Sequence, residues 1–392
     1  MSRKSLLIIG GTGVLRTAVV SEALRQGLKV TIINRGNRMN IIPHGVELIK
    51  SDVHDRPKVE SLLVNRHFDT VIDFICFNKK QIEYSFDLFK NYASQYVFIS
   101  SACVYDTTIP GLKDEDSPKV LKDWNYSVNK WDCEEYLKKK GEEANIPYTI
   151  VRPCITYDNT RIPYGIVPPY GYHWTFVSRI LCDKPIITWD LGKARWNMMR
   201  VEDFAVGVCS IIGNKAAFGE VFNISGDVAY SWEDVLCTLE DILKKKITRV
   251  DIPSSVYRNL DKENSGRICG RSMDLIVSNA KIKGLCPQFG TKIGLREGLE
   301  MTLESYKSHN YQKGIDWKYD ANVDRIIRQW CTKNKIEIDT HMVSYMDYLG
   351  NATFCNRIEY WLTYHELRSL YIFPVRIWRK LLKIFKKDIQ YK

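Results

Sequence analysis

Leu6-Leu-Ile-Ile-Gly-Gly-Thr-Gly13 is the stretch that decides the fold of this 392-residue chain. Its four apolar residues predict a short strand, and its glycines open a turn ahead of a helical run at Thr17–Gln26. In that context glycines let the backbone approach a diphosphate, and the helix N-terminus adds partial positive charge. An ordinary tight turn is the alternative. The dinucleotide contacts expected here are Gly10, Thr12, Gly13, Val14 and Leu15.

The glycine turn departs from the dinucleotide fingerprint at one position. Where the pattern Gly-x-x-Gly-x-x-Gly has its third glycine, this chain has Arg16. That glycine normally allows close packing of helix on strand, so a large side chain should displace the helix or swing outward. We expect the geometry to be adjusted without loss of phosphate binding.

The second predicted strand, Val30–Ile33, leads into a basic loop. An NAD enzyme usually has Asp or Glu here for the ribose hydroxyls. Asn34 removes the charge that would repel a 2′-phosphate, and Arg35 or Arg38 can hold one. NADP is therefore favoured over NAD, with a solvated basic loop as the alternative.

Two further strand ends are expected to contribute to the cofactor site. After the third strand, Asp52 can meet the adenine amine with Val53 beside it, although a helix-capping role for Asp52 is the alternative. Phe74, at the end of the fourth strand, is also assigned to the cofactor.

Short β-rich runs alternate with helical runs through the first half of the chain. Several strand candidates are apolar throughout, as a parallel sheet covered on both faces requires. This alternation predicts an α/β fold, Rossmann-like, with a doubly wound parallel sheet. The strand candidates are Leu6–Ile9, Val30–Ile33, Glu47–Lys50, Thr70–Phe74, Tyr96–Ser100 and Tyr148–Val151.

Three segments are expected along the chain. Residues 1–160 form the NAD(P)-binding core, and residues 161–308 add the remaining core elements and a small substrate-binding lobe. Residues 309–392, rich in Trp, Tyr and charge, form a mostly helical extension. Further helices are expected at Val59–Asn65, Asp203–Ile212, Trp232–Lys244 and Leu295–Ser308.

Tyr126-Ser-Val-Asn-Lys130, with Ser101 placed 25 residues ahead of the tyrosine, predicts proton-transfer chemistry beside the cofactor. Residues four apart share one face of a helix, so Tyr126 and Lys130 can act together. A free tyrosine has a pKa of about 10, and nearby positive charge favours the phenolate. Tyr126 moves the proton, Ser101 orients the substrate oxygen and Lys130 holds the nicotinamide ribose. Ser100 is the alternative polar partner.

These residues resemble the extended short-chain dehydrogenase/reductases, and among them the NAD-dependent epimerase/dehydratases that modify nucleotide sugars. The resemblance spans roughly residues 5–308 and implies a Rossmann domain, bound NAD or NADP, and a small lobe that grips a nucleoside diphosphate sugar. It also implies a nicotinamide contact near Pro153 and leaves a homodimer open. The segments that carry it are residues 10–13, 96–101, 104–105, 126–130, 151–153, 201–205 and 219–224.

Two departures from the family pattern bear on the reaction and the substrate. Dehydratases place an acidic pair after the catalytic hydroxyl residue, whereas Ser101 is followed by Ala102-Cys103, so dehydration is disfavoured. Epimerases often have an arginine that binds phosphate just before the Val-x-Asp-x-Ala segment. In this chain that position holds Trp196, with Arg195 beside it. Solvated arginines and a core tryptophan are the alternatives. The substrate-binding candidates are Arg195, Trp196, Arg267 and Arg271.

Overall composition narrows the cellular setting. The net charge of +11 suits an anionic ligand, nucleic acid or an anionic membrane surface. Eleven cysteines without a Cys-x-x-Cys pair indicate reduced thiols in a cytoplasmic protein, and no metal is expected. The basic amphipathic stretch 373–387 suits a helix on the inner face of a membrane, with a packed terminal helix as the alternative.

Three functions remain in competition. The first is an NAD(P)-dependent nucleotide-sugar oxidoreductase, either a 4-keto reductase or an epimerase. The second is an RNA-binding protein that resembles the chloroplast stem-loop-binding proteins; nucleic acid is disfavoured because it does not require Ser101, Tyr126 and Lys130 together. The third is an inactive cofactor sensor or scaffold, for which Arg16 is the best support.

Overall fold

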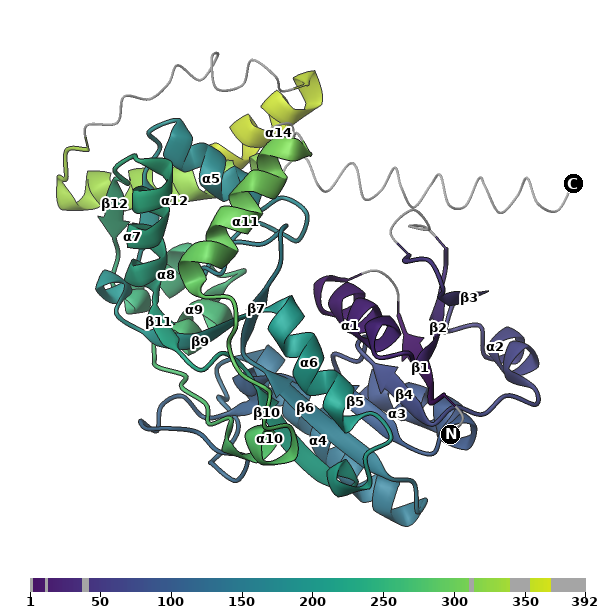
Figure 1. Ribbon diagram of the computed structural model, residues 1–392. Coiled ribbons are helices and arrows are strands. Elements are labelled where there is room, and N and C mark those ends of the chain that lie inside the picture. Colours follow the sequence, from purple (N-terminus) through teal and green to yellow (C-terminus); the bar gives the residue numbers. More distant parts are fainter. Residues whose placement is uncertain (1–2, 11–12, 37–41, 310–313, 339–352, 368–392) are drawn as a thin grey trace, which may run out of the picture.

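The computed structural model describes residues 3–10, 13–36, 42–309, 314–338 and 353–367 (Figure 1). Its centre is a seven-stranded sheet with the order β10-β6-β5-β4-β1-β2-β3, in which every neighbouring pair is parallel. The strand order changes direction between β1 and β4, the place where such sheets bind ligands. The predicted Rossmann-like α/β fold is confirmed. The strands are β1 (Ser5–Ile9), β2 (Lys29–Asn34), β3 (Glu47–Lys50), β4 (Thr70–Asp73), β5 (Tyr96–Ile99), β6 (Tyr148–Pro153) and β10 (Glu220–Ile224).

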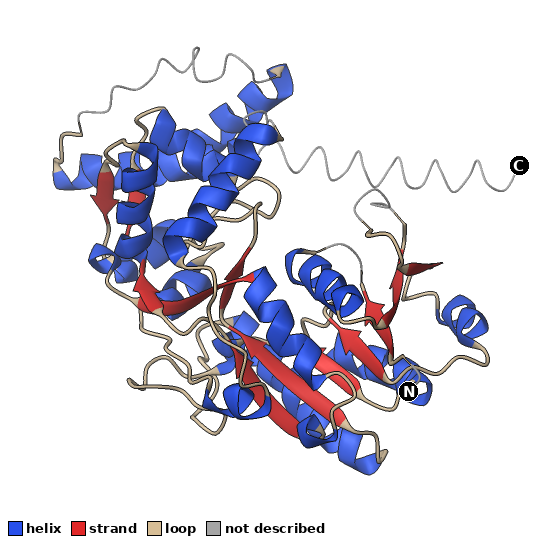
Figure 2. Cartoon of the chain, viewed as in Figure 1, coloured by secondary structure: helices blue, strands red, loops and turns tan. Residues whose placement is uncertain are grey.

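Helices cover both faces of this sheet, which explains why β1 is apolar from Leu6 to Ile9 (Figure 2). Leu6 and Ile8 pack in one core cluster, and Leu7 and Ile9 pack in another on the opposite face. Successive side chains of a strand point to opposite faces, so both sets must be hydrophobic. The first face carries α1 (Val14–Arg25), α6 (Val201–Ile211) and α10 (Ala280–Leu285); the second carries α2 (Arg56–Leu63), α3 (Lys79–Phe89) and α4 (Asn125–Glu143).

The predicted strands lie within two residues of the observed bounds. Two predicted helices begin three residues earlier than expected: α1 begins at Val14 rather than Thr17, and α2 begins at Arg56 rather than Val59. Gly13 is the N-cap of α1, in an extended conformation, so that helix starts directly at the glycine turn. The predicted helix Leu295–Ser308 matches α11 at both ends.

A second layer of short strands and helices lies beyond the carboxyl edge of the sheet (Figure 1). One three-stranded sheet has the order β11-β9-β7, and β8 pairs with β12. The rings of Tyr164, Trp189, Trp196 and Trp232 pack together in its core, with centroids 5.6 to 6.1 Å apart. Its elements are β7 (Ile155–Tyr157), α5 (Trp174–Leu181), β8 (Ile186–Thr188), β9 (Arg195–Arg200), β11 (Ala229–Ser231), α7 (Trp232–Leu243), β12 (Arg249–Asp251), α8 (Ser254–Leu260), α9 (Ser265–Arg271) and α11 (Leu295–Ser308).

Two helices of the predicted extension, α12 (Trp317–Asn334) and α14 (Phe354–Tyr364), dock on this lobe. Buried charges make the attachment: Asp320 of α12 lies 2.6 Å from both Arg179 Nη1 and Lys184 Nζ. Asp324 adds contacts of 2.8 Å to Arg179 and 2.6 Å to Lys184. The division into three segments stays a prediction. The basic stretch 373–387 lies outside the described residues.

A second buried ion pair fastens helix α4 to the sheet. The carboxylate of Glu134 accepts hydrogen bonds from Arg152 Nε at 3.0 Å and from Arg152 Nη2 at 2.6 Å, and both side chains are fully buried. The Ser100 hydroxyl also donates to Glu134, at 2.5 Å. Arg152 Nη1 donates to the Tyr105 hydroxyl at 2.9 Å and to the Glu115 carbonyl at 3.0 Å. This network ties α4 to β6 and to the end of β5.

We expect Glu134→Gln to lower the free energy of unfolding by about 3–5 kcal/mol, because it leaves the Arg152 guanidinium buried without a carboxylate. Urea denaturation followed by tryptophan fluorescence measures the change. The control is Glu135→Gln, the next residue, which removes a solvent-exposed pair with Lys138 and should change stability by less than about 1 kcal/mol. Equal effects of the two substitutions would contradict a special role for the buried pair.

Candidate active site

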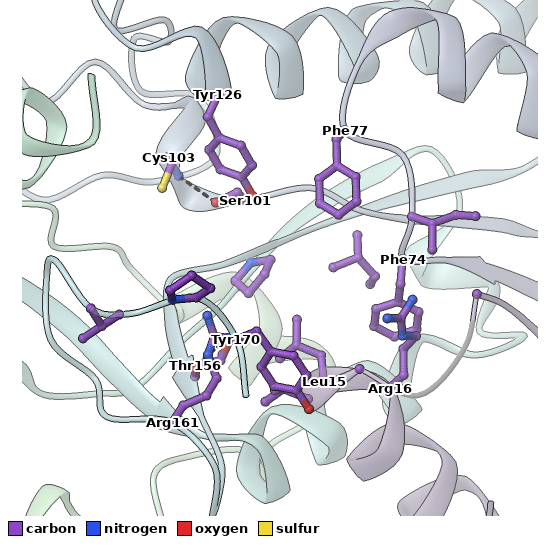
Figure 3. Close-up of a pocket in the computed structure, with 18 of the residues that line it drawn as sticks. Leu15, Arg16, Phe74, Phe77, Ser101, Cys103, Tyr126, Thr156, Arg161 and Tyr170 are labelled. Carbon is purple, nitrogen blue, oxygen red and sulfur yellow. Dashed lines mark hydrogen bonds between the residues drawn. The ribbon is translucent and has the colours of Figure 1, made fainter. Parts of the chain in front are cut away.

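One cavity of about 1300 Å³ runs between the carboxyl edge of the sheet and the second layer. Typical single-ligand pockets measure roughly 300–1,000 Å³, so this cavity has room for a dinucleotide and a second ligand. Figure 3 shows its middle, with Ser101 and Tyr126 on one side and Arg161 and Tyr170 on the other.

The cavity brings together most of the residues assigned to the cofactor. The side chain of Lys130 reaches it from α4, and the other contacts come from the ends of β1, β2, β3, β4 and β6 and from the start of α1. Thr12 and Arg38 lie outside the described residues. The cofactor candidates that line the cavity are Gly10, Gly13, Val14, Leu15, Asn34, Arg35, Asp52, Val53, Phe74, Lys130 and Pro153.

Gly10 and Gly13, the described ends of the glycine turn, fit the close approach of a diphosphate. Gly10 has a φ of +93°, and a Cβ there would collide with Ile75 Cγ2. Within the described residues, no side chain caps the N-terminus of α1, so its first amides are available to a ligand. The absence of a side chain at Gly10 and the uncapped N–H groups of α1 are the two features that dinucleotide binding requires.

Asn34, at the end of β2, and Asp52, after β3, each accept a hydrogen bond from the backbone of their own loop. Asn34 Oδ1 accepts from the Gly36 amide at 2.7 Å, which turns this side chain onto its own loop. Asp52 Oδ1 accepts from the His54 amide at 3.0 Å. The cap of α2 is instead Asp55, which accepts from Lys58 N at 3.4 Å, so Asp52 does not cap that helix.

Ser101 and Tyr126 meet where β5 ends and α4 begins. Ser101 Oγ accepts from the Cys103 amide at 3.2 Å, which fixes the serine at the start of a short turn (Figure 3). Ser100, the alternative partner, donates its hydroxyl to Glu134 at 2.5 Å. Of the two serines, Ser101 is the one whose hydroxyl faces Tyr126 (Figure 3).

Burial, and after it the neighbouring Cys103, raise the pKa of Tyr126 to about 12. Hydrogen bonding with Ser101 and the positive charge of Arg271 and Arg161 act in the opposite direction. At neutral pH the phenol is therefore protonated, and it needs additional positive charge before it can act as a base.

Lys130 is held by the backbone of two strand ends. Its ammonium donates to the Cys76 carbonyl at 2.7 Å and to the Ile99 carbonyl at 2.9 Å. The rings of Phe77 and Phe98 flank it, each with its centroid 4.8 Å away. Burial lowers its pKa. An ammonium has three N–H donors, so one remains for a ligand in the cavity.

The far end of the cavity is rich in arginine. Arg267 and Arg271, one turn apart on α9, line it as predicted candidates, and Arg161 joins them. Burial and the neighbouring Arg267 lower the pKa of Arg271 to about 10. In the described part of the chain, the carboxylates that line this end are engaged: Glu263 pairs with Lys318 at 3.0 Å, and Asp316 Oδ1 accepts from the Tyr319 amide at 2.8 Å. An excess of positive charge results.

The other two substrate candidates lie away from the cavity. Arg195 is exposed and pairs with Asp274 at 2.8 Å. Trp196 is fully buried, and its Nε1 donates to the Met273 carbonyl at 3.0 Å. Its ring centroid lies 5.5 Å from the Arg271 guanidinium, so Trp196 supports that arginine within the core instead of facing a ligand.

Arg161 and His173 are cavity residues that the sequence motifs did not indicate. His173 is buried and its Nδ1 accepts from the Ile162 amide at 3.0 Å. Burial, followed by the charge of Arg161, lowers the pKa of His173 to about 3. The ring is therefore neutral, and the other ring nitrogen, Nε2, carries its proton. Neither residue belongs to a spaced motif, because both come from loops that only the fold brings to this cavity.

A family comparison agrees with this arrangement. The sequence model of the NAD dependent epimerase/dehydratase family matches residues 6–225, more than half of the chain. The chain belongs to this family. The resemblance predicted from the sequence is thus confirmed, and the family is described as NAD dependent.

Solved structures share the fold. A UDP-glucuronic acid 4-epimerase from Bacillus cereus superposes with a TM-score of 0.64 at 19% identity, covering 78% of this chain and 99% of that one. An epimerase from Methanothermobacter thermautotrophicus gives 0.64 at 17% identity, covering 80% and 95%.

Curated relatives are more varied. A chloroplast stem-loop binding protein of 41 kDa from Arabidopsis thaliana is 26% identical over 58% of this chain and 60% of its own length. A 2′-dehydrokanamycin reductase from Streptomyces kanamyceticus is 19% identical, covering 64% and 69%. A UDP-N-acetyl-alpha-D-glucosaminuronate decarboxylase from Bacillus cytotoxicus is 23% identical, covering 78% and 98%.

Two further features are absent from the described ranges. No helix there is both long and apolar enough to cross a bilayer. No group of His, Cys, Asp and Glu there has the arrangement of a metal site.

Acid should destabilise the protein partly through His173. Its folded pKa of about 3 lies below the unfolded value of about 6.5, so its contribution to stability is complete above pH 6.5 and is lost as the pH falls toward 3. Between pH 7 and pH 4 this loss amounts to about 3 kcal/mol. In His173→Asn, the amide oxygen can still accept from the Ile162 N–H. Between pH 7 and pH 4 we expect the free energy of unfolding of this variant to fall by about 3 kcal/mol less than that of the wild type. Urea denaturation at the two pH values measures it, and an equal acid sensitivity of both proteins would refute the assignment.

Proposed function

We propose that this chain is an NAD(P)-dependent oxidoreductase of nucleotide sugars, acting as a 4-keto reductase or an epimerase. The observation that carries the proposal is the lining of one cavity. Ser101, Tyr126 and Lys130 lie between a dinucleotide cradle and an arginine-rich end. A proton-transfer group between a hydride carrier and a site for an anionic substrate is what such a reaction needs.

The residues divide the chemistry among them. A nicotinamide dinucleotide held at Gly10, Gly13 and Lys130 would supply or accept the hydride. Tyr126 gives a proton to the substrate oxygen during reduction, or removes it during oxidation, while Ser101 orients that oxygen. The raised pKa of the Tyr126 phenol keeps its proton in place at neutral pH, so the proton is available to a substrate oxygen. Lys130 offers its remaining N–H to the cofactor ribose and supplies positive charge.

Arginine side chains support the substrate class. A nucleoside diphosphate sugar carries its negative charge on two phosphates, and guanidinium groups bind phosphate oxygens through paired N–H donors. Arg161, Arg267 and Arg271 line a part of the cavity whose carboxylates are otherwise engaged. One nitrogen of Arg161 and one of Arg271 already donate to backbone carbonyls, and their other N–H groups remain for phosphate. We assign the substrate diphosphate to these three residues.

NADP is favoured over NAD at the adenosine end. Asn34, the last residue of β2, carries no negative charge that would repel a 2′-phosphate. Arg35, which follows it, lines the cavity. This assignment favours a reductase that exchanges its cofactor, whereas an epimerase usually retains NAD through the cycle.

RNA binding is a second candidate, because a stem-loop binding protein is among the relatives, at 26% identity over 58% of this chain. It ranks lower, since binding to RNA gives no reason for Ser101, Tyr126 and Lys130 to share a cavity with the glycine turn.

Replacement of Tyr126 by Phe tests the enzyme proposal. We expect turnover to fall by about 100-fold or more, because the proton donor is lost, while NADPH binding persists. Turnover is measured with a panel of nucleoside diphosphate sugars and their 4-keto derivatives. The control is Tyr136→Phe, on the same helix but outside the cavity. Unchanged turnover in Tyr126→Phe would refute the assigned role; wild-type protein that binds an RNA stem-loop and turns over no sugar would favour the second candidate.

Cofactor preference can be tested at Arg35. Charge-assisted hydrogen bonds contribute roughly 1.5–3 kcal/mol, so Arg35→Gln should weaken NADPH binding by about tenfold and leave NADH binding nearly unchanged. Quenching of tryptophan fluorescence gives both dissociation constants. Lys29→Gln, at the opposite end of β2, removes the same charge and serves as control. A wild-type preference for NADH, or a loss of affinity for both dinucleotides alike, would overturn the 2′-phosphate assignment.

A further inference from the structure

Arg16 occupies the position of the third glycine without pushing α1 away from the sheet. Val19, Val20 and Ala23 of this helix are buried in the same core cluster as Leu6 and Ile8 of β1. The normal function of that glycine is close packing of helix on strand, and here the packing is achieved with an arginine. The Arg16 side chain must therefore point away from the interface between α1 and the sheet.

The Arg16 side chain folds back over the glycine turn. A Cβ atom built on Gly10 would lie 2.6 Å from Arg16 Nη1, and one built on Gly13 would lie 2.9 Å from Arg16 Cζ. The guanidinium therefore rests against both glycines, in the part of the cavity where the fingerprint receives a diphosphate. Figure 3 shows it beside the Phe74 ring, and its Cζ lies 5.9 Å from that ring centroid.

This guanidinium has no fixed anion. Among the described residues, the Arg16 side chain makes no hydrogen bond and no ion pair. Asp73 is the carboxylate whose charge attracts it most, but that group accepts from the Ile75 amide at 2.7 Å, Cys76 Sγ at 3.1 Å and the Tyr96 hydroxyl at 2.8 Å, as well as from Ser85. Burial lowers the pKa of Arg16, although an arginine in a protein keeps its charge.

We propose that Arg16 binds the diphosphate of the dinucleotide directly, so that a side chain adds to the backbone donors of the glycine turn. A guanidinium presents paired N–H donors that match two phosphate oxygens. Because Gly10 and Gly13 have no side chains, there is room beside them for the phosphates and for the Arg16 guanidinium that binds them. The inference rests on the dinucleotide cofactor of the family and is independent of the sugar and of the reaction direction.

The experiment compares dinucleotide affinities without any substrate. NADH and ADP-ribose are titrated into wild-type protein, Arg16→Gln and Arg16→Gly, with binding followed by calorimetry at low and high salt. The control is Arg25→Gln, at the other end of the same helix, which removes an equal charge from an exposed pair with Glu22. Thermal denaturation checks that each variant is folded.

We expect Arg16→Gln to weaken both ligands by about 10- to 100-fold, as the loss of a charge-assisted contact predicts. The difference from wild type should shrink at high salt, and Arg25→Gln should bind as wild type does. Unchanged or tighter binding by Arg16→Gly, which restores the standard fingerprint, would overturn the proposal and make Arg16 an obstacle to the phosphates. A failed sugar assay leaves this result untouched, so the two proposals can fail separately.

Discussion

A buried carboxylate and a buried guanidinium hold the reactive part of the molecule in place. Glu134 and Arg152 join α4 to β6, and the same carboxylate holds Ser100 at the end of β5. Lys130 and Tyr126 lie about one and two helical turns before Glu134 on the same helix. Because Ser101 follows Ser100 directly, one ionic contact sets the positions of all three predicted catalytic residues relative to the sheet. Charges of this kind are costly to bury, and satisfied partners keep the cost tolerable.

The cavity has a consistent electrostatic layout along its length. Arg35 and Arg16 lie at the end formed by β1, β2 and α1, and Arg161, Arg267 and Arg271 lie at the opposite end. Between them the Tyr126 phenol is neutral, because burial outweighs the positive charge around it. An oxidised nicotinamide would add a further positive charge in this middle section, which is the change needed to release the phenolic proton. The ionisation of the tyrosine is thus expected to follow the redox state of the cofactor.

Local patterns predicted the parts of this molecule that local chemistry determines. The apolar strands, the glycine turn and the Tyr126–Lys130 spacing each depend on neighbours in sequence, and the structure contains all of them. Arg161 and His173 come from loops, and the residues of α12 come from far along the chain, so no short spacing could indicate them. Trp196 was assigned to the substrate through its place in a segment, but its burial depends on Met273 and Arg271, which are distant in sequence. Arg16 was recognised as unusual, whereas the direction of its side chain required the packing of α1.

The attachment of α12 has a consequence for how the protein matures. Asp316, Lys318, Tyr319 and Asn322 form part of the cavity wall, and Asp320 and Asp324 neutralise the buried Arg179 and Lys184. Synthesis delivers α12 long after the sheet and helix α4. A nascent chain can therefore complete the proposed dinucleotide site early, while the arginine-rich end of the cavity lacks part of its wall and Arg179 and Lys184 lack their carboxylates. Acquisition of activity should accordingly be a late event in biogenesis, separated in time from the folding of the nucleotide-binding half.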